Sequence, residues 1–211
     1  MEIANSVIIL LFVISIFSNL PGRQAGLGKK ETSYEANKSK QSVAMNYSAL
    51  PLSNFSISTE AETKESLNRF VLPRAKKISA DEAGLLVDSI MKYSKEYDVN
   101  PKLVAALIDR ESSFNPRSVS SSNAQGLAQL LPSTARDIGI SDPFDIEEGT
   151  KGAALYLKMM MDKWRGLSDQ VVLALASYAE GFNQIFRADR SYSSKTAQYV
   201  KDILDRCYQM N

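Results

Sequence analysis

Glu111 is the residue of this 211-residue chain best placed to do chemistry, because it continues an apolar helical stripe. The stripe repeats at helical spacing through Leu103, Val104, Leu107 and Ile108. A carboxyl group on such a face is partly removed from water, which disfavours its charged form and raises its pKa. A carboxylic acid that keeps its proton near neutral pH can give that proton to a leaving group. Position alone fits an acid that merely ends a helix near the surface equally well.

The elements that must position Glu111 are predicted to be helices. Asn100 as N-cap and Pro101 at the first helical position open the helix that ends at Glu111. On that helix Asp109 is expected to face away from the stripe as a solvated charge. Two capping boxes predict the starts of two other helices, Ser79 with Glu82 and Asp145 with Glu148.

Further helices are predicted along the second half of the chain. A short one is expected over Gln125–Leu131, broken at Pro132, with Ser133 able to cap the next turn. Ser168 is expected to cap a helix that Gly181 closes, and a last helix is predicted over Ser194–Cys207. No alternating strand pattern competes with these helices, so the predicted fold class is all-α.

Three motifs follow the Glu111 block in a fixed order. They are Gly126-Leu127-Ala128-Gln129-Leu130-Leu131-Pro132, Ala176-Ser177-Tyr178-Ala179-Glu180-Gly181 and Tyr199-Val200. With the block Glu111-Ser112-Ser113-Phe114-Asn115-Pro116, this set resembles the catalytic domain of soluble lytic transglycosylases, a branch of the lysozyme-like superfamily. The resemblance covers about residues 80–205, and it implies a lysozyme-like helical domain.

The sequence departs from the pattern of that family at a few positions. Ala128 and Leu131 stand where the family usually has Met, and Lys195 stands where an acidic residue is frequent. Ala179-Glu180 replaces the usual Asn-Ala, which removes an amide expected to contact substrate and adds a carboxylate. These changes bear on substrate contact, and we expect Glu180 to tune binding without performing the chemistry.

The resemblance implies roles for named residues. Glu111 would be the catalytic acid, and Ser120 and Gln129 would line the substrate cleft around the scissile sugar. The hydroxyl of Tyr199 would approach the catalytic acid, and Tyr178 would be a further substrate-site residue. Both tyrosines lie on apolar stripes, so a core role is the alternative for each.

The implied reaction is cleavage of the β-1,4 bond between MurNAc and GlcNAc in peptidoglycan, with formation of a 1,6-anhydro-MurNAc end. Glycosidases usually need two carboxylates flanking the bond, whereas lytic transglycosylases work with one acid. Two alternatives remain open. One is a lysozyme-type peptidoglycan hydrolase in which water attacks, and the other is a catalytically weak peptidoglycan-binding protein.

Composition excludes several classes of function. The net charge is +1, so binding to nucleic acid has no electrostatic support. The chain has no His, which excludes Ser-His or Cys-His catalysis and removes the commonest zinc ligand. Its single cysteine, Cys207, cannot form an intramolecular disulfide. We therefore expect no metal and no cofactor.

The N-terminal part divides into two predicted segments. Residues 1–23 contain an apolar run from Val7 to Phe17 that fits a cleaved signal peptide, with an uncleaved membrane anchor as the rival. Residues 24–76 are polar without helical period and predict a disordered linker, leaving 77–211 as the catalytic domain. Export would place the protein in the periplasm or cell envelope. Its expected partners are peptidoglycan strands and components of a secretion or conjugation apparatus.

Overall fold

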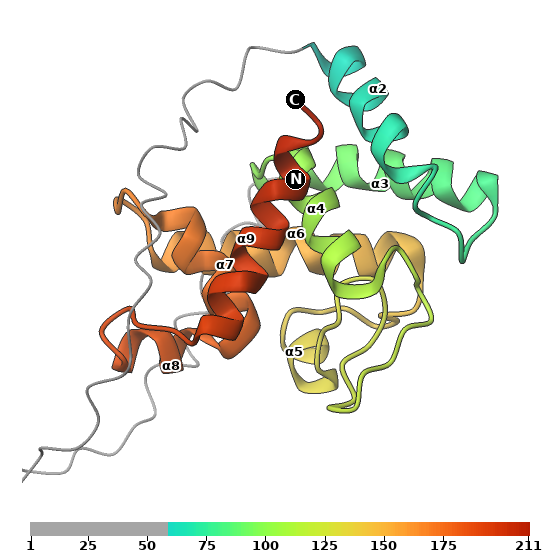
Figure 1. Ribbon diagram of the computed structural model, residues 1–211. Coiled ribbons are helices and arrows are strands. Elements are labelled where there is room, and N and C mark those ends of the chain that lie inside the picture. The colour runs from blue at the N-terminus through green and yellow to red at the C-terminus, as the bar shows by residue number, and fades with distance from the viewer. Residues whose placement is uncertain (1–58) are drawn as a thin grey trace, which may run out of the picture. The chain divides into compact units, whose positions relative to one another are not determined.

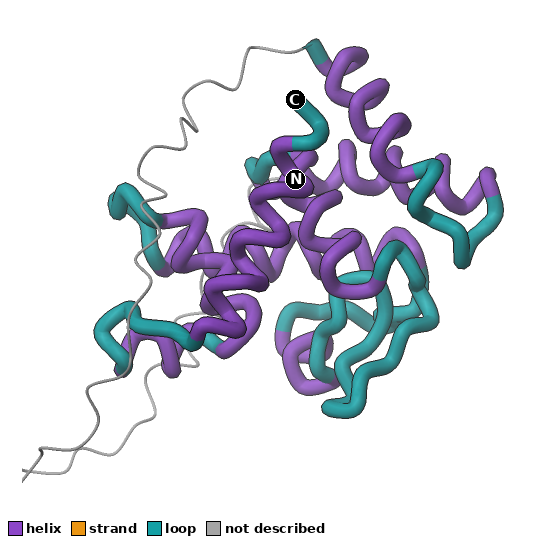
Figure 2. The backbone as a smooth tube through the Cα atoms, viewed as in Figure 1, coloured by secondary structure: helices purple, strands orange, loops and turns teal. Residues whose placement is uncertain are grey.

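Residues 59–211, which the computed structural model describes, form eight α-helices and no β-strand (Figure 1). The all-α prediction is confirmed for these residues, and Figure 2 shows the helices separated by loops of very different length. None of the helices in residues 59–211 is long and apolar enough to cross a membrane. The helices are α2 (Glu60–Val71), α3 (Ala80–Tyr97), α4 (Pro101–Ser112), α5 (Pro132–Asp137), α6 (Ile146–Lys163), α7 (Gln170–Glu180), α8 (Phe182–Arg187) and α9 (Ser194–Tyr208).

Helix α4 lies at the centre of the packing. Its side chains from Lys102 to Ile108 are all buried, and those from Val104 to Ile108 are fully removed from solvent. It contacts α2, α3, α6 and α9, and α9 runs along it over much of its length (Figure 1). Complete burial of a Leu or Ile contributes about 1.5–3 kcal/mol relative to exposure. The end of α4 therefore has a well-fixed position.

Helix starts follow the side chains that can cap them. Ser79 and Glu82 form the predicted capping box of α3, and Asn100 accepts hydrogen bonds from two backbone N–H groups at the start of α4. Asp145 caps α6 as predicted, but Glu148 does not complete the box. The Glu148 carboxylate instead accepts hydrogen bonds from the Ser141 and Asp142 backbone N–H groups at 2.7 and 3.0 Å.

The expected helix over Gln125–Leu131 is wrong, because this segment is a tight turn. Gln125 and Leu130 exchange backbone hydrogen bonds of 2.9 and 3.2 Å, which no helix of that register allows. Gly126 has a φ of 72°, and a Cβ there would lie 1.7 Å from the Pro143 carbonyl oxygen. The close approach requires glycine. Pro132 begins α5 directly after this turn, so Ser133 does not cap it.

The predicted cap of α7 is also wrong, whereas its end is confirmed. Helix α7 begins after Asp169 and has no side-chain cap, so Ser168 lies outside it. Gly181 closes the helix with a φ of 89°, as expected for a glycine C-cap. The last helix, α9, is confirmed and extends one residue beyond Cys207.

Part of the segment predicted to be a disordered linker is helical, because α2 lies within it and packs against α3 and α4. Thr59 and Glu62 form a capping box at its start, within the segment assigned to the linker. The apolar residues Leu67, Phe70 and Val71 are buried, and the Ser66 hydroxyl donates a hydrogen bond to the Met210 carbonyl. Only a two-turn stripe among polar residues marks this helix, and packing against α3 and α4 stabilises it. Residues 1–58, with the predicted signal segment, lie outside the described residues.

Two leucines near the end of α2 give a matched test of this packing. Leu67 is fully buried, while Leu72 is 48% exposed. We expect Leu67→Ala to lower the free energy of unfolding by about 2–5 kcal/mol, since it leaves a cavity in the core. Leu72→Ala should change it by less than about 0.5 kcal/mol. Urea denaturation followed by circular dichroism measures both, and equal midpoints for the two variants would show that α2 is not part of the core.

Candidate active site

Glu111 lies on the last turn of α4, where the chain leaves the helix abruptly. Ser113 and Phe114 both adopt positive φ, at 51° and 58°, an uncommon conformation for residues with a side chain. Burial of Phe114 holds this bend, because its ring is fully removed from solvent and meets Phe70 edge-on at 6.2 Å. The bend ends α4 directly after Glu111, so the acid stands at the edge of the core with part of its side chain in solvent.

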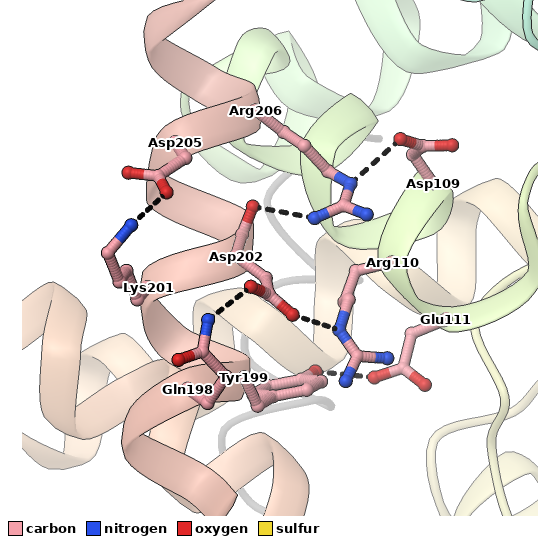
Figure 3. Close-up of polar contacts among 9 residues, drawn as sticks. All are labelled: Asp109, Arg110, Glu111, Gln198, Tyr199, Lys201, Asp202, Asp205 and Arg206. Carbon is pink, nitrogen blue, oxygen red and sulfur yellow. Dashed lines mark hydrogen bonds and ion pairs between the residues drawn. The ribbon is translucent and has the colours of Figure 1, made fainter.

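The Tyr199 hydroxyl donates a hydrogen bond to Oε1 of Glu111 (Figure 3). Tyr199 belongs to α9 and is only 8% exposed. Its ring is part of the hydrophobic core, and its hydroxyl faces the acid. The predicted approach of Tyr199 to Glu111 therefore occurs in this structure. Burial raises the pKa of Tyr199 far above its ordinary value, so the hydroxyl keeps its proton and can act as a donor.

Burial raises the pKa of Glu111 above that of an ordinary glutamate. Two contacts oppose this effect and lower the pKa, first the hydrogen bond from Tyr199 and then the positive charge of Arg110. The result is a carboxyl group that holds its proton to higher pH than usual and still has a donor that stabilises its ionised form. A group of this kind can first give a proton and later accept one.

Two ion pairs join α4 to α9 beside this contact (Figure 3). Arg110 Nε lies 3.2 Å from the Asp202 carboxylate, and Arg206 Nε lies 2.9 Å from the Asp109 carboxylate. The Asp109 side chain is only 11% exposed, so the expected solvated charge is instead a largely buried ion pair. Arg110 and Asp202 were not predicted as site residues, because their separation of 92 residues leaves no local signal in the sequence.

Tyr178 supports the turn that carries Gln129. Its hydroxyl donates a 2.8 Å hydrogen bond to the Ala128 carbonyl, and its ring meets Tyr156 at 5.0 Å. Glu111 also raises the pKa of Tyr178 through its charge, after the larger effect of burial. Thus α7 contributes a second tyrosine within electrostatic range of the acid. A substrate-binding role for Tyr178 stays a prediction.

Ser120 and Gln129 shape the loop between α4 and α5. The Gln129 amide donates hydrogen bonds to the Ser118 and Gly126 carbonyls at 3.1 and 3.0 Å. Ser120 Oγ accepts hydrogen bonds from the backbone N–H groups of Ser122 and Ala124. The observed contacts of both residues thus hold the loop that follows the acid, and their predicted contacts with sugar stay predictions.

Glu180 ties the end of α7 to the start of α9. Its Oε1 accepts hydrogen bonds from the Ser193 hydroxyl at 3.0 Å and from the buried Thr196 hydroxyl. Burial by itself raises the pKa of Glu180, but the hydrogen bonds from Thr196 and Ser193 outweigh it and bring the pKa below the ordinary value. Because Ser193 is the N-cap of α9, the carboxylate stabilises the first turn of the helix that carries Tyr199.

The described residues contain no group of three or more His, Cys, Asp or Glu side chains placed to hold a metal ion. At this site the residues that could act chemically are an acid, two tyrosines and an arginine. Such a set can protonate a leaving group and hold the proton donor in place.

This site lies within a recognised family of domains. Residues 88–201 match the family described as the transglycosylase SLT domain, which is more than half of the chain. The chain belongs to this family. The matched range contains Glu111, Ser120, Gln129, Tyr178 and Tyr199, and membership confirms the resemblance seen in the motifs.

Relatives of this SLT domain come from phage and bacteria. The chain is 34% identical over 117 residues to a transglycosylase of Enterobacteria phage PRD1, covering 56% of the chain and 41% of the relative. It is 36% identical over 124 residues to membrane-bound lytic murein transglycosylase F of Vibrio cholerae, covering 56% of the chain and 23% of the relative. The chain therefore spans less than half the length of these relatives.

Solved structures share the fold of the SLT domain. The 70 kDa soluble lytic transglycosylase of Escherichia coli aligns with a TM-score of 0.51 and 20% identity, over 58% of this chain and 23% of that one. An inactive variant of lytic transglycosylase Slt from Pseudomonas aeruginosa aligns with a TM-score of 0.50 and 21% identity, over 57% and 23%. At this level of identity the likeness concerns the fold alone.

We expect Tyr199→Phe to raise the pKa of Glu111, because the variant loses the hydroxyl that stabilises the carboxylate and keeps the buried ring. The pKa can be measured from the pH titration of the Glu111 carboxyl carbon by NMR. Tyr178→Phe is the matched control, since its hydroxyl bonds to the Ala128 carbonyl and not to the acid. An unchanged or lower Glu111 pKa in Tyr199→Phe would contradict the contact.

Glu180→Gln should destabilise the domain in a pH-dependent way. At pH 7 the loss of a charged acceptor should cost about 1–2 kcal/mol of unfolding free energy. Since the pKa of Glu180 is lowered in the folded state, this stabilisation is present above its unfolded pKa and is lost as pH falls through the folded pKa.

Urea denaturation at pH 7 and pH 3 provides the measurement for Glu180→Gln. The gap in unfolding free energy between wild type and variant should narrow at the lower pH. Asp169→Asn is the control at the other end of α7, because the Asp169 side chain makes no capping hydrogen bond. A gap that is the same at both pH values would refute the role of the ionised carboxylate.

Proposed function

We propose that this protein is a peptidoglycan lytic transglycosylase in which Glu111 is the one catalytic acid and base. The observation that carries the proposal is the Glu111 carboxyl group, partly desolvated at the end of α4 and hydrogen-bonded by Tyr199. Membership of the transglycosylase SLT domain family supports the reaction class. The relative from Vibrio cholerae is named a lytic murein transglycosylase, which supports peptidoglycan as substrate.

In the first step Glu111 gives its proton to the oxygen between MurNAc and GlcNAc. The bond between C1 of MurNAc and this oxygen breaks, and its electron pair stays on the leaving oxygen. The carbonyl oxygen of the substrate's own N-acetyl group stabilises the positive charge that develops at C1. The raised pKa of Glu111 favours this step, because the acid must arrive protonated.

In the second step the Glu111 carboxylate accepts the proton of the C6 hydroxyl of the same MurNAc. The O6 oxygen attacks C1 and closes the 1,6-anhydro ring, so no water is added and Glu111 regains its proton. The hydrogen bond from Tyr199 stabilises the carboxylate between the two steps. One residue therefore serves both steps because its pKa is raised by burial and partly restored by its neighbours.

The contacts of Glu180 weigh against a hydrolase with two carboxylates. A lysozyme-type hydrolase would use a second carboxylate to hold water or attack C1. Glu180, the carboxylate that departs from the family pattern, bonds to Ser193, Thr196 and Gln184 instead. Because its carboxylate accepts hydrogen bonds from residues at the start of α9, Glu180 is not placed as a second catalytic carboxylate, which supports a mechanism with a single acid.

We also propose that the protein acts in the cell envelope, where it opens peptidoglycan for an envelope-spanning apparatus such as a secretion or conjugation system. The apolar run Val7–Phe17 supports export, although it lies outside the described residues. The relative from Vibrio cholerae is named a membrane-bound lytic murein transglycosylase, which supports a location in the cell envelope. Fractionation of cells expressing the full chain tests the location, and a cytoplasmic protein would overturn it.

Glu111→Gln should abolish cleavage of murein and leave the fold intact. The amide is nearly isosteric with the acid but can neither give nor take the proton, so we expect a loss of at least about 10²-fold in rate. Mass spectrometry of digested murein gives the reaction class, since the 1,6-anhydro product is one water lighter than a hydrolysis product. Hydrated products from the wild-type protein would favour the hydrolase, and an active Glu111→Gln variant would remove Glu111 as the acid.

A further inference from the structure

Arg110 is next to the catalytic acid in the chain, but its side chain contacts α9. Its Nε donates a hydrogen bond to Asp202 of α9 at 3.2 Å, and its Cζ lies 5.1 Å from the centroid of the Tyr199 ring. Figure 3 shows the guanidinium group between Asp202 and the pair formed by Tyr199 and Glu111. One side chain thus contacts both the helix that carries the tyrosine and the tyrosine itself.

We infer that Arg110 is a positioning residue that, held by Asp202, keeps Tyr199 on Glu111 and sets the upper pH limit at which the acid works. This inference rests on the proposed function of Glu111. It concerns a residue outside the set that the motifs identified, and it gives the ion pair between α4 and α9 a role in catalysis besides stability.

The chemistry of guanidinium suits this position. Its flat face can lie over an aromatic ring while an N–H group at its rim bonds to a carboxylate, and its charge persists at every relevant pH. A lysine ammonium at this position would keep the charge but lacks the flat face and the fixed direction of the Nε–H donor. The Arg110 side chain is 36% exposed, so solvent screens its charge and the expected electrostatic effect is moderate.

The groups that act on Glu111 come from three helices. Arg110 is on α4 itself, Tyr199 comes from α9, and Tyr178, whose pKa Glu111 raises, comes from α7. Asp202 of α9 is paired with Arg110 and not with the acid. Both tyrosines stay neutral because burial raises the pKa of each hydroxyl. Arg110 is then the nearby cation, and it lowers the pKa of Glu111. Removing that charge should let Glu111 hold its proton to higher pH.

A second ion pair in the same interface provides a matched control. Arg206 and Asp109 also join α9 to α4, one helical turn along α9 from Asp202, and Figure 3 shows them directed away from Glu111. Asp109 is less exposed than Asp202, at 11% against 30%. Breaking the Arg206 pair should therefore affect stability at least as much as breaking the Arg110 pair, without reaching the acid.

The test compares Arg110→Gln, Arg110→Lys and Arg206→Gln in the full chain. The pH profile of murein cleavage, the melting temperature and the NMR titration of the Glu111 carboxyl carbon are measured for each. We expect Arg110→Gln to slow cleavage about 3–10-fold at the pH optimum. The alkaline limb of the pH profile should shift to higher pH by about half a unit, which corresponds to a roughly threefold change in the proton affinity of Glu111. The direction follows because loss of the cation raises the pKa of the acid.

Arg110→Lys separates charge from geometry. It should slow cleavage nearly as much as Arg110→Gln but move the alkaline limb by less, because the charge that lowers the pKa of Glu111 remains. Full activity in Arg110→Lys would overturn the positioning role. Arg206→Gln should lower the melting temperature and leave the limb in place, and a limb that moves equally in Arg206→Gln and Arg110→Gln would reduce Arg110 to a structural residue.

The NMR titration distinguishes failure of this inference from failure of the proposed function. If Glu111→Gln retains activity, the proposed function fails while the titration still reports whether Arg110 lowers the pKa of Glu111. If Glu111→Gln is inactive and Arg110→Gln leaves both the titration and the alkaline limb unchanged, the role of Arg110 fails alone.

Discussion

The hydrogen bond from Tyr199 to Glu111 is the contact on which the rest of the site depends. It joins two residues 88 positions apart, so it exists only if α4 and α9 pack in one register. Burial of α4 fixes one partner, and the apolar face of α9 with Tyr199, Val200 and Ile203 fixes the other. The two ion pairs between these helices, and the Glu180 contacts at the start of α9, further restrain the position of α9 relative to α4.

The loop after Glu111 also helps to position the acid, and it does so through backbone conformations with positive φ. Phe114 keeps a positive φ because its ring is buried against Phe70, and this bend exposes the end of α4 just after Glu111. The turn at Gln125–Leu130 is held by Gly126, by the Gln129 amide and by the Tyr178 hydroxyl. Ser113, Phe114 and Gln129, which have positive φ, thus lie in the segment that follows the acid, while Asp98 and Asp189 have positive φ elsewhere in the fold.

The sequence predicted what depends on local pattern. The start and end of α4, the caps of α3 and α6 and the position of Glu111 follow from spacing within one turn of helix. Helix α2 was not predicted, because its apolar stripe is short and packing against the domain stabilises it. The turn at 125–130 was predicted as a helix, because the constraint on Gly126 comes from the Pro143 carbonyl, which is distant in sequence. The Arg110–Asp202 pair had no sequence signal, since helix register across 92 residues decides it.

The acids of this domain differ by environment more than by type. Glu82 and Glu148 accept backbone hydrogen bonds near helix starts, and these contacts lower the pKa of each. Glu180 has a lowered pKa because the hydrogen bonds from Thr196 and Ser193 outweigh the effect of burial. For Glu111 the effect of burial is larger than that of the hydrogen bond from Tyr199, so its pKa is raised. Environments that push carboxyl groups in opposite directions separate structural acids from a proton donor. Here that separation leaves Glu111 as the acid that the proposed mechanism uses for both proton transfers, while Glu180, the carboxylate that the family pattern lacks, stabilises the helix that brings Tyr199 to it.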